Sequence, residues 1–255
     1  TPTLTWSEFR VTIGTHDGRK HVLLIEVIVD TTEVRHTARI ITRCTCNGCS
    51  IVILHIAHIS TKNAVDFVRQ AKKNGIKVTA EATPQHLTMT EDMVDMTDSS
   101  TKVNPPLRTD EDVKAVLNGL IDGTVDMIVT DHSPHAEEEK DKEYRYAPSG
   151  FPGLETAVGV LLTDLYHKGK IDLPLLIEKM TSAPARIFNL KKGTLNKNVP
   201  ADITVIDTQK EWIVEKDKFY TRGSHSPFIG RKLKGKPVMT IVDGRIIMQN
   251  GIIIE

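Results

Sequence analysis

Short apolar runs alternate with helical spacing through the middle of the chain. Runs at 51–57, 76–82 and 126–130 are rich in β-branched residues, which favours strands buried on both faces of a parallel sheet. Apolar residues at 64–71 and 113–120 recur at helical spacing, so a helix is predicted after each of the first two runs. This alternation predicts an α/β fold with at least three parallel strands.

The two ends of the chain have a different pattern. Near the N-terminus, 9–13 and 21–29 flank Asp17-Gly18, which predicts a β-hairpin, whereas 31–50 show neither helical nor strand periodicity. From Gly193 onward, strand-like pieces indicate a small β domain. These pieces lie at 201–206, 212–214, 238–242 and 245–248, with a predicted hairpin turn at Asp243-Gly244.

Three further helices are predicted between these regions, at 154–168, 173–181 and 182–188. Pro174 suits the first turn of the second of them, where a missing N–H costs nothing. Thr109 is predicted to cap the helix that contains 113–120, through Asp112.

Charge and hydropathy exclude several classes of protein. The 33 basic and 33 acidic residues give a formal net charge of zero, which argues against electrostatic binding to nucleic acid or to a membrane surface. No apolar run approaches the roughly 20 residues that span a bilayer, and no signal peptide is visible. We expect a cytoplasmic protein.

The three cysteines are confined to one short segment. Cys44, Cys46 and Cys49 are an odd number, so they do not form a secreted disulfide framework. A C-x-C-x-x-C cluster can bind zinc or copper through thiolates, but a nearby histidine would have to supply the fourth ligand. A loop without metal is the favoured interpretation.

Polar side chains follow the predicted strands, at the edge where parallel α/β sheets build their sites. Asp131, His132 and His135 come directly after 126–130, and His58 ends the run that contains His55. Strand side chains alternate, so the two histidines of that run are predicted to face opposite ways, with His58 the better placed. The alternative is a capped strand end with surface and core histidines.

A proline-restricted loop lies between the second and third strands. Each proline limits itself and its predecessor, so 102–108 is predicted to be rigid and to present Asn104 and Arg108. A simple linker is the alternative. His86 is expected in a loop before this segment.

Several motifs, taken together, resemble the bacterial-type dihydroorotases of the cyclic amidohydrolase superfamily. They are His-Ile-Ala-His-Ile-Ser-Thr-Lys-Asn at 55–63, Val-Asn-Pro-Pro-Leu-Arg at 103–108, Thr-Asp-His-Ser-Pro-His at 130–135 and Gly-Phe-Pro-Gly-Leu-Glu-Thr at 150–156. Segments 201–207 and 226–230 fit the same family. The resemblance covers about residues 51–255, and four motifs in the right order make it specific.

The resemblance implies a (β/α)8 TIM-type metallo-dependent hydrolase barrel with a small β-sandwich domain. It implies reversible cyclisation of N-carbamoyl-L-aspartate to L-dihydroorotate in pyrimidine biosynthesis, with two zinc ions per subunit. His58 and Asp131 match zinc ligands, and Asp131 also matches the catalytic acid/base. Asn104, His135 and the backbone of Pro152 and Gly153 match substrate contacts.

The sequence also departs from this family. It contains no His-x-His pair, and the bridging acidic residue and the fifth-strand histidine have no recognisable counterparts. We therefore expect an incomplete barrel, with 1–50 unassigned or a hairpin of the small β domain, 51–192 in the barrel and 193–255 in the small β domain. His16 and His21 are candidates for missing ligands.

Three hypotheses follow. The first is a dihydroorotase-type hydrolase, which as written would hold substoichiometric zinc. The second is a non-catalytic dihydroorotase-like assembly protein, with aspartate carbamoyltransferase as a candidate partner and a homodimer also open. The third is a related enzyme that acts on allantoin or a hydantoin.

Overall fold

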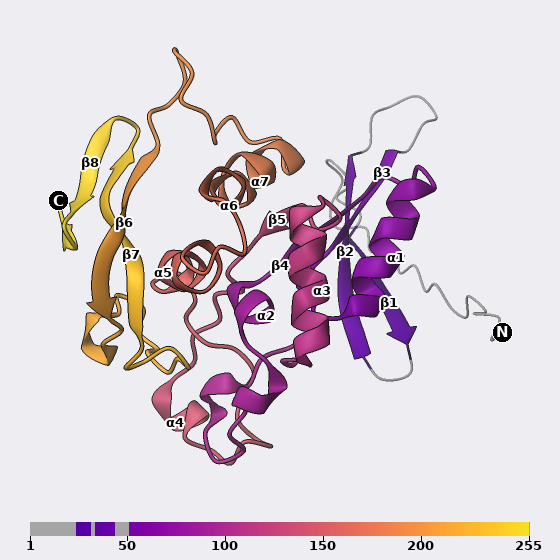
Figure 1. Cartoon of the computed structure of the whole chain (residues 1–255), viewed down its shortest axis with the longest axis horizontal. Helices are drawn as coiled ribbons and strands as arrows, with labels where there is room; N and C mark the ends of the chain where they lie inside the picture. The colour runs from indigo at the N-terminus through magenta and orange to yellow at the C-terminus, as the bar shows by residue number, and fades with distance from the viewer. Residues whose placement is uncertain (1–23, 32–33, 44–50, 255) are drawn as a thin grey trace, which may run out of the picture.

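The computed structural model describes residues 24–31, 34–43 and 51–254, with side chains from residue 54 onward (Figure 1). Within this part, no helix is long and apolar enough to cross a membrane. The predicted strand at 9–13, the Asp17-Gly18 turn and the three cysteines lie outside the described residues.

The first sheet has five strands in the order β1-β2-β3-β4-β5. They are β1 (Leu24–Thr31), β2 (Val34–Arg43), β3 (Ile51–Ile56), β4 (Val78–Ala82) and β5 (Met127–Ile128). β3 pairs with β4 in parallel, and β4 pairs with β5 in parallel. The prediction of three parallel strands is therefore confirmed.

The strands before β3 correct the sequence reading. β2 is a ten-residue strand inside the segment for which no periodicity was found, and it pairs antiparallel with both β1 and β3. Hydrogen bonding from two neighbours fixes an extended strand where the side-chain pattern gives little signal. β1 and β2 lie in the first sheet, whereas residues 1–50 were left either unassigned or as a possible hairpin of the small β domain.

The helices between the parallel strands are built as predicted. α1 (Lys62–Lys73) and α3 (Asp110–Ile121) pack against each other, and Thr109 accepts a hydrogen bond from the amide of Asp112. Asp112 also accepts one from the amide of Lys62, at 2.8 Å, so a single carboxylate ties the N-termini of both helices together. These helices cover the apolar face of the sheet that contains Val78 and Ala80.

Shorter helices complete the first body. They are α2 (Pro84–Thr88), α4 (Glu137–Lys140), α5 (Ala157–Leu161), which continues as a π-helix at Leu162–Tyr166, α6 (Leu173–Met180) and α7 (Ser182–Ile187). Single 3-10 turns lie at Glu91–Met93, Ser99–Thr101 and Lys216–Lys218. His86 lies in α2 and is buried, so its expected loop position was wrong.

The second sheet is antiparallel, in the order β6-β7-β8-β9. Its strands are β6 (Ile203–Ile213), β7 (Lys232–Val242), β8 (Arg245–Gln249) and β9 (Ile252–Ile253). The pieces predicted at 201–206 and 212–214 belong to one strand interrupted by register shifts, and Asp243-Gly244 forms the expected turn with positive φ at both residues.

One side of this sheet packs on the first body. α5 lies between β7 and the parallel strands in Figure 1. Gly159 approaches Trp212 and Leu233 so closely that a side chain there would collide with both. Many apolar residues of the sheet remain exposed, including Ile213, Ile252 and Ile253, each with more than half of its surface accessible.

Candidate functional site

Five side chains form a continuous row across the three parallel strands. We call Thr79, His55, Glu81, His58 and Asp131 the strand-end row. His55 contacts Thr79 through Nδ1 at 2.7 Å and donates from Nε2 to Glu81 at 2.8 Å. Glu81 lies 3.1 Å from Nδ1 of His58, and Nε2 of His58 lies 3.3 Å from Oδ1 of Asp131. The strand ends therefore converge, as predicted.

His55 and His58 contact the same carboxylate, which corrects the prediction that they face opposite ways. β3 ends at Ile56, and His58 has a φ of 53°, so the two-residue alternation of a strand does not extend to it. Asp131 has a φ of 49° at the corresponding place after β5. Left-handed backbone is uncommon outside glycine and concentrates at functional sites, where surrounding structure maintains it.

The contacts within the row shift the pKa values of His58 and Glu81. Burial disfavours the charged form of His58, but hydrogen bonding and charge from Asp131 and Glu81 outweigh it and raise its pKa to about 9. Burial likewise opposes ionisation of Glu81, yet His55 and His58 lower its pKa to about 2. Glu81 is therefore a buried carboxylate held between two imidazoles, a role that sequence analysis did not assign to it.

The pair His58 and Asp131 fits a shared metal ion. Two ligands at about 2.0–2.1 Å from a tetrahedral zinc lie about 3.3 Å apart, the separation between Nε2 and Oδ1 here. Glu81 contacts Nδ1 of His58, the ring nitrogen that does not face Asp131. In metal sites, a carboxylate at this position orients the histidine that binds the metal. The Glu81 oxygen and Nδ1 of His58 lie 3.1 Å apart, but the Nδ1–H of His58 is not well aligned with that oxygen.

The described residues supply at most two ligands for a candidate metal ion. Within 54–254, no group of three histidine, cysteine, aspartate or glutamate side chains is arranged to hold a metal ion. The two candidate extra ligands, His16 and His21, lie outside the described residues. Two donors without further ligands bind zinc weakly.

The turn at 151–153 is fixed to the strand end by His132. The amides of Gly153 and Leu154 lie 3.2 and 3.3 Å from Nδ1 of His132, so this nitrogen accepts and the proton of the neutral ring is on Nε2. A β-carbon at residue 153 would lie 2.8 Å from the carbonyl oxygen of Thr130, which explains the glycine. The Gly153 N–H is thus engaged within the protein, and Pro152 has no N–H to offer.

His135 is held by the loop that follows it. Its Nε2 donates to the carbonyl of Ser149 at 3.0 Å, and its Nδ1 lies 3.7 Å from Glu139. Gly150 has a φ of 121° and lies against Ser133, so the loop closes tightly over the strand end. The structure brings His135 and the Pro152-Gly153 turn into one loop system, as the motifs imply, while their contact with a substrate stays a prediction.

Asn104 is exposed, and the buried His86 supports its loop. Nε2 of His86 donates to the carbonyl of Pro105 at 2.9 Å, and Nδ1 accepts from the hydroxyl of Thr83 at 2.7 Å. Among the described residues, no hydrogen bond holds the Asn104 side chain. Burial lowers the pKa of His86 to about 4, and the positive charge of His58 acts in the same direction. The hydrogen bond to Pro105 opposes this shift but does not outweigh it. Sequence analysis missed this supporting role, although the Thr-Pro-x-His spacing after a strand was a signal for it.

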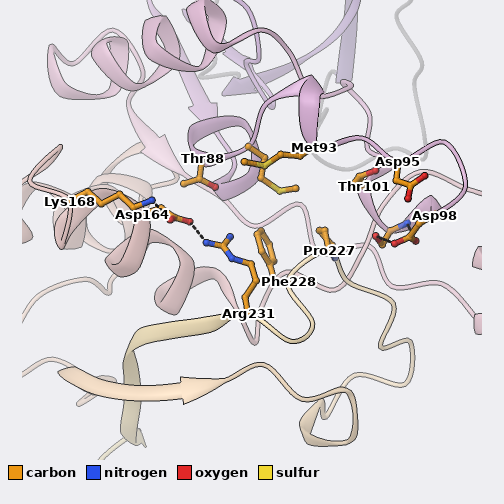
Figure 2. A pocket seen from close by; sticks show the side chains of 12 residues that line it. Thr88, Met93, Asp95, Asp98, Thr101, Asp164, Lys168, Pro227, Phe228 and Arg231 are labelled. Carbon is orange, nitrogen blue, oxygen red and sulfur yellow. Dashed lines mark hydrogen bonds and ion pairs between the residues drawn. The ribbon is translucent and has the colours of Figure 1, made fainter.

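A separate cavity of about 480 Å³ lies beside the second sheet (Figure 2). It is lined by Met93, Asp98 and Phe228 among others, and by the ion pair between Arg231 and Asp164 at 2.9 Å. None of the candidate site residues lines it. Asp164 binds both lining cations, Lys168 and Arg231, while Asp98 pairs with His225 outside the lining.

Comparison with known proteins finds relatives in the family that the motifs resemble. The chain is 50% identical over 197 residues to a dihydroorotase of Endomicrobium trichonymphae, which covers 77% of this chain and 47% of that protein. It is 50% identical over 200 residues to a dihydroorotase of Pelotomaculum thermopropionicum, covering 78% and 47%. The chain thus spans about half the length of these relatives.

Solved structures share the fold. An L-hydantoinase (dihydropyrimidinase) from Arthrobacter aurescens superposes with a TM-score of 0.75 at 32% identity, covering 79% of this chain and 46% of that one. A dihydropyrimidinase from Brevibacillus agri NCHU1002 gives 0.74 at 22% identity, which supports the fold alone. The expected α/β class with a partial barrel is therefore confirmed. The sequence profile of the amidohydrolase family matches residues 11–247, and the chain belongs to this family.

Proposed function

We propose that this chain carries part of a zinc-dependent dihydroorotase site, which interconverts L-dihydroorotate and N-carbamoyl-L-aspartate in pyrimidine biosynthesis. The observation that carries the proposal is the strand-end pair, with Nε2 of His58 3.3 Å from Oδ1 of Asp131. These are the two residues that the dihydroorotase motifs match to zinc ligands. The names and roughly 50% identity of the relatives support the same substrate.

Each residue has a chemical task in this proposal. Zinc held by His58 and Asp131 would supply a Lewis acid that polarises the ring carbonyl and acidifies water. Asp131 takes a proton from the attacking water on a carboxylate oxygen and passes it to the leaving amide nitrogen. Glu81, kept in place by His55, orients the His58 ring so that Nε2 faces Asp131.

The loops supply the substrate contacts. Asn104 has a free amide on an exposed, supported segment, which can pair with an imide or a carboxylate. His135 exchanges its bond to Ser149 for one to the substrate, and the turn contributes the carbonyl of Pro152, since the Gly153 N–H is bound to His132.

Two alternatives remain tied to specific observations. The likeness to an L-hydantoinase favours a related cyclic amide as substrate. The presence of only two converging metal donors among residues 54–254 favours a non-catalytic assembly protein, with aspartate carbamoyltransferase or a second copy of the chain as the candidate partner.

Zinc uptake and hydrolysis test the proposal together. The purified chain and its Asp131→Asn variant are titrated with zinc and assayed with L-dihydroorotate, hydantoin and allantoin. We expect less than one zinc per chain, uptake that depends on Asp131, and slow turnover that is fastest with L-dihydroorotate. Asp126→Asn, at the other end of β5 and paired with Lys72 at 2.8 Å, is the control and should keep the zinc.

Each other outcome has a meaning. Equal zinc uptake by the unmodified chain and the Asp131→Asn variant would contradict the proposed metal pair. Faster turnover of hydantoin or allantoin supports the related enzyme, and zinc uptake without any turnover supports the assembly protein. Two tightly held zinc ions would show that residues 1–50 supply ligands.

A further inference from the structure

Two lysine ammonium groups converge on the loop that follows α4. Lys102 donates from Nζ to the carbonyls of Tyr144 at 2.6 Å, Arg145 at 3.0 Å and Ala147 at 2.6 Å. Lys140 donates from Nζ to the carbonyls of Pro148 at 3.1 Å and Gly150 at 2.9 Å. We call Lys102 and Lys140 the lysine pair. Five of the seven carbonyls between residues 144 and 150 therefore point at this pair.

The backbone of the pair is fixed as well. The amide of Gly150 donates to the carbonyl of Lys102 at 2.8 Å, and the hydroxyl of Ser99 donates to the carbonyl of Lys140. The Lys102 ammonium also lies 5.4 Å from the ring centre of Tyr144. Each lysine thus connects the loop to a segment that is distant along the chain.

Burial makes these contacts unusual for lysine. Lys140 is 2% exposed, and it is among the largest fully buried side chains of the described residues. Burial and the nearby Lys102 lower its pKa to about 8. A buried ammonium without a carboxylate partner is costly, so the carbonyl dipoles must compensate for it. The loop and the lysine pair therefore stabilise each other.

The arrangement has a consequence for the candidate site. Ser149, which holds His135, lies between the two residues whose carbonyls Lys140 binds. Lys102 is two residues before Asn104, so it links the two segments expected to contact the substrate. We propose that the lysine pair are positioning residues, which fix the 144–150 loop and thereby place His135 and the following turn against Asn104.

The placement of substrate contacts in this inference rests on the proposed function. The order of the 144–150 loop can be measured without any activity. Trypsin cleavage after the exposed Arg145 reports directly on the loop, because the Arg145 carbonyl is one of the groups that Lys102 binds. Lys102→Met and Lys140→Met are compared with the unmodified chain by mass spectrometry. Lys179→Met is the matched control, since Lys179 is also buried and donates to a backbone carbonyl, that of Val125, at 2.8 Å.

We expect Lys102→Met to accelerate the Arg145 cut by about tenfold or more, which corresponds to about 1.4 kcal/mol of lost local order. Lys140→Met should accelerate it less, since its contacts lie beyond the cut, and Lys179→Met should not accelerate it. Equal cleavage in folded Lys102→Met and Lys179→Met would overturn the proposal.

A measurement on the unmodified chain covers the case in which the variants fail to fold. The amide of Gly150 should exchange its hydrogen at least about ten times more slowly than in a synthetic peptide of residues 141–152. Exchange at the peptide's rate would also overturn the proposal. In an active preparation, Lys102→Met should raise KM for L-dihydroorotate more than it lowers kcat. Absence of activity in the unmodified chain would count against the proposed function, while the cleavage assay still decides the role of the lysine pair.

Discussion

The two halves of the candidate site are held in place by different means. In the strand-end row, side chains bind side chains, and each donor or acceptor belongs to a strand or lies within three residues of its end. In the loop half, side chains bind backbone carbonyls, as the buried His86 does at Pro105 and the half-buried Lys102 does at Tyr144. The proposed metal-binding half is thus a property of the sheet, whereas the proposed substrate-binding half depends on a few long-range anchors.

This difference predicts how each half fails. Removing Glu81 from the row takes the shared carboxylate away from His55 and His58, and the cost falls on global stability. An anchor removed from a loop leaves the sheet intact, and the cost falls on local order and on binding. Stability and binding measurements on the same set of variants therefore separate the two halves.

The largest expected effect comes from breaking the row at its centre. Glu81→Ala should lower the free energy of unfolding by about 3–5 kcal/mol, because the buried His55 loses its carboxylate partner and His58 keeps only Asp131. Glu81→Gln, which keeps the shape and one acceptor, should cost less. Urea denaturation followed by circular dichroism measures both.

The control for this variant is an exposed ion pair. Glu211 contacts Lys232 at 2.6 Å, with more than half of each side chain accessible, so Glu211→Ala should cost less than about 1 kcal/mol. A similar small loss for Glu81→Ala would show that the row contributes little to the sheet.

The sequence predicted the sheet half of this comparison better than the loop half. The β-branched runs predicted the parallel strands, and their polar ends located His58 and Asp131, because strand ends of one parallel sheet must meet at one edge. Glu81 was missed because a single acidic residue inside an apolar run gives no signal of its partners. Lys102 and Lys140 were missed because their acceptors are carbonyls some 8 to 45 residues away, and any sequence has carbonyls.

The next largest effect is expected at His86, which supports the Asn104 loop, and it is an effect of pH on stability. The pKa of His86 falls from 6.5 to about 4 on folding, so between these values the unfolded chain binds more protons than the folded one. The stability that the neutral, buried His86 contributes is fully present above pH 6.5 and is lost as the pH falls to 4. Its size is on the order of 3 kcal/mol. His86→Gln should therefore lose less stability than the unmodified chain between pH 7 and pH 4.

Other titrating groups cancel in this comparison, because both proteins carry them. Thermal unfolding at pH 7, 6, 5 and 4 gives the difference at each pH. Parallel curves for the two proteins would mean that His86 is not held in its neutral form by burial beneath the Asn104 loop.

The smallest effect on stability is expected at the tip of that loop. Asn104 is exposed and has no side-chain hydrogen bond among the described residues, so Asn104→Ala should change the free energy of unfolding by less than about 0.5 kcal/mol. Its amide is nonetheless expected to pair with the bound ring, and losing that pair should weaken L-dihydroorotate binding by about 1–3 kcal/mol. Calorimetric titration measures this loss even where turnover is slow. Asn118→Ala, an exposed asparagine on α3, should change neither quantity, and equal binding by the two variants would remove Asn104 from the site.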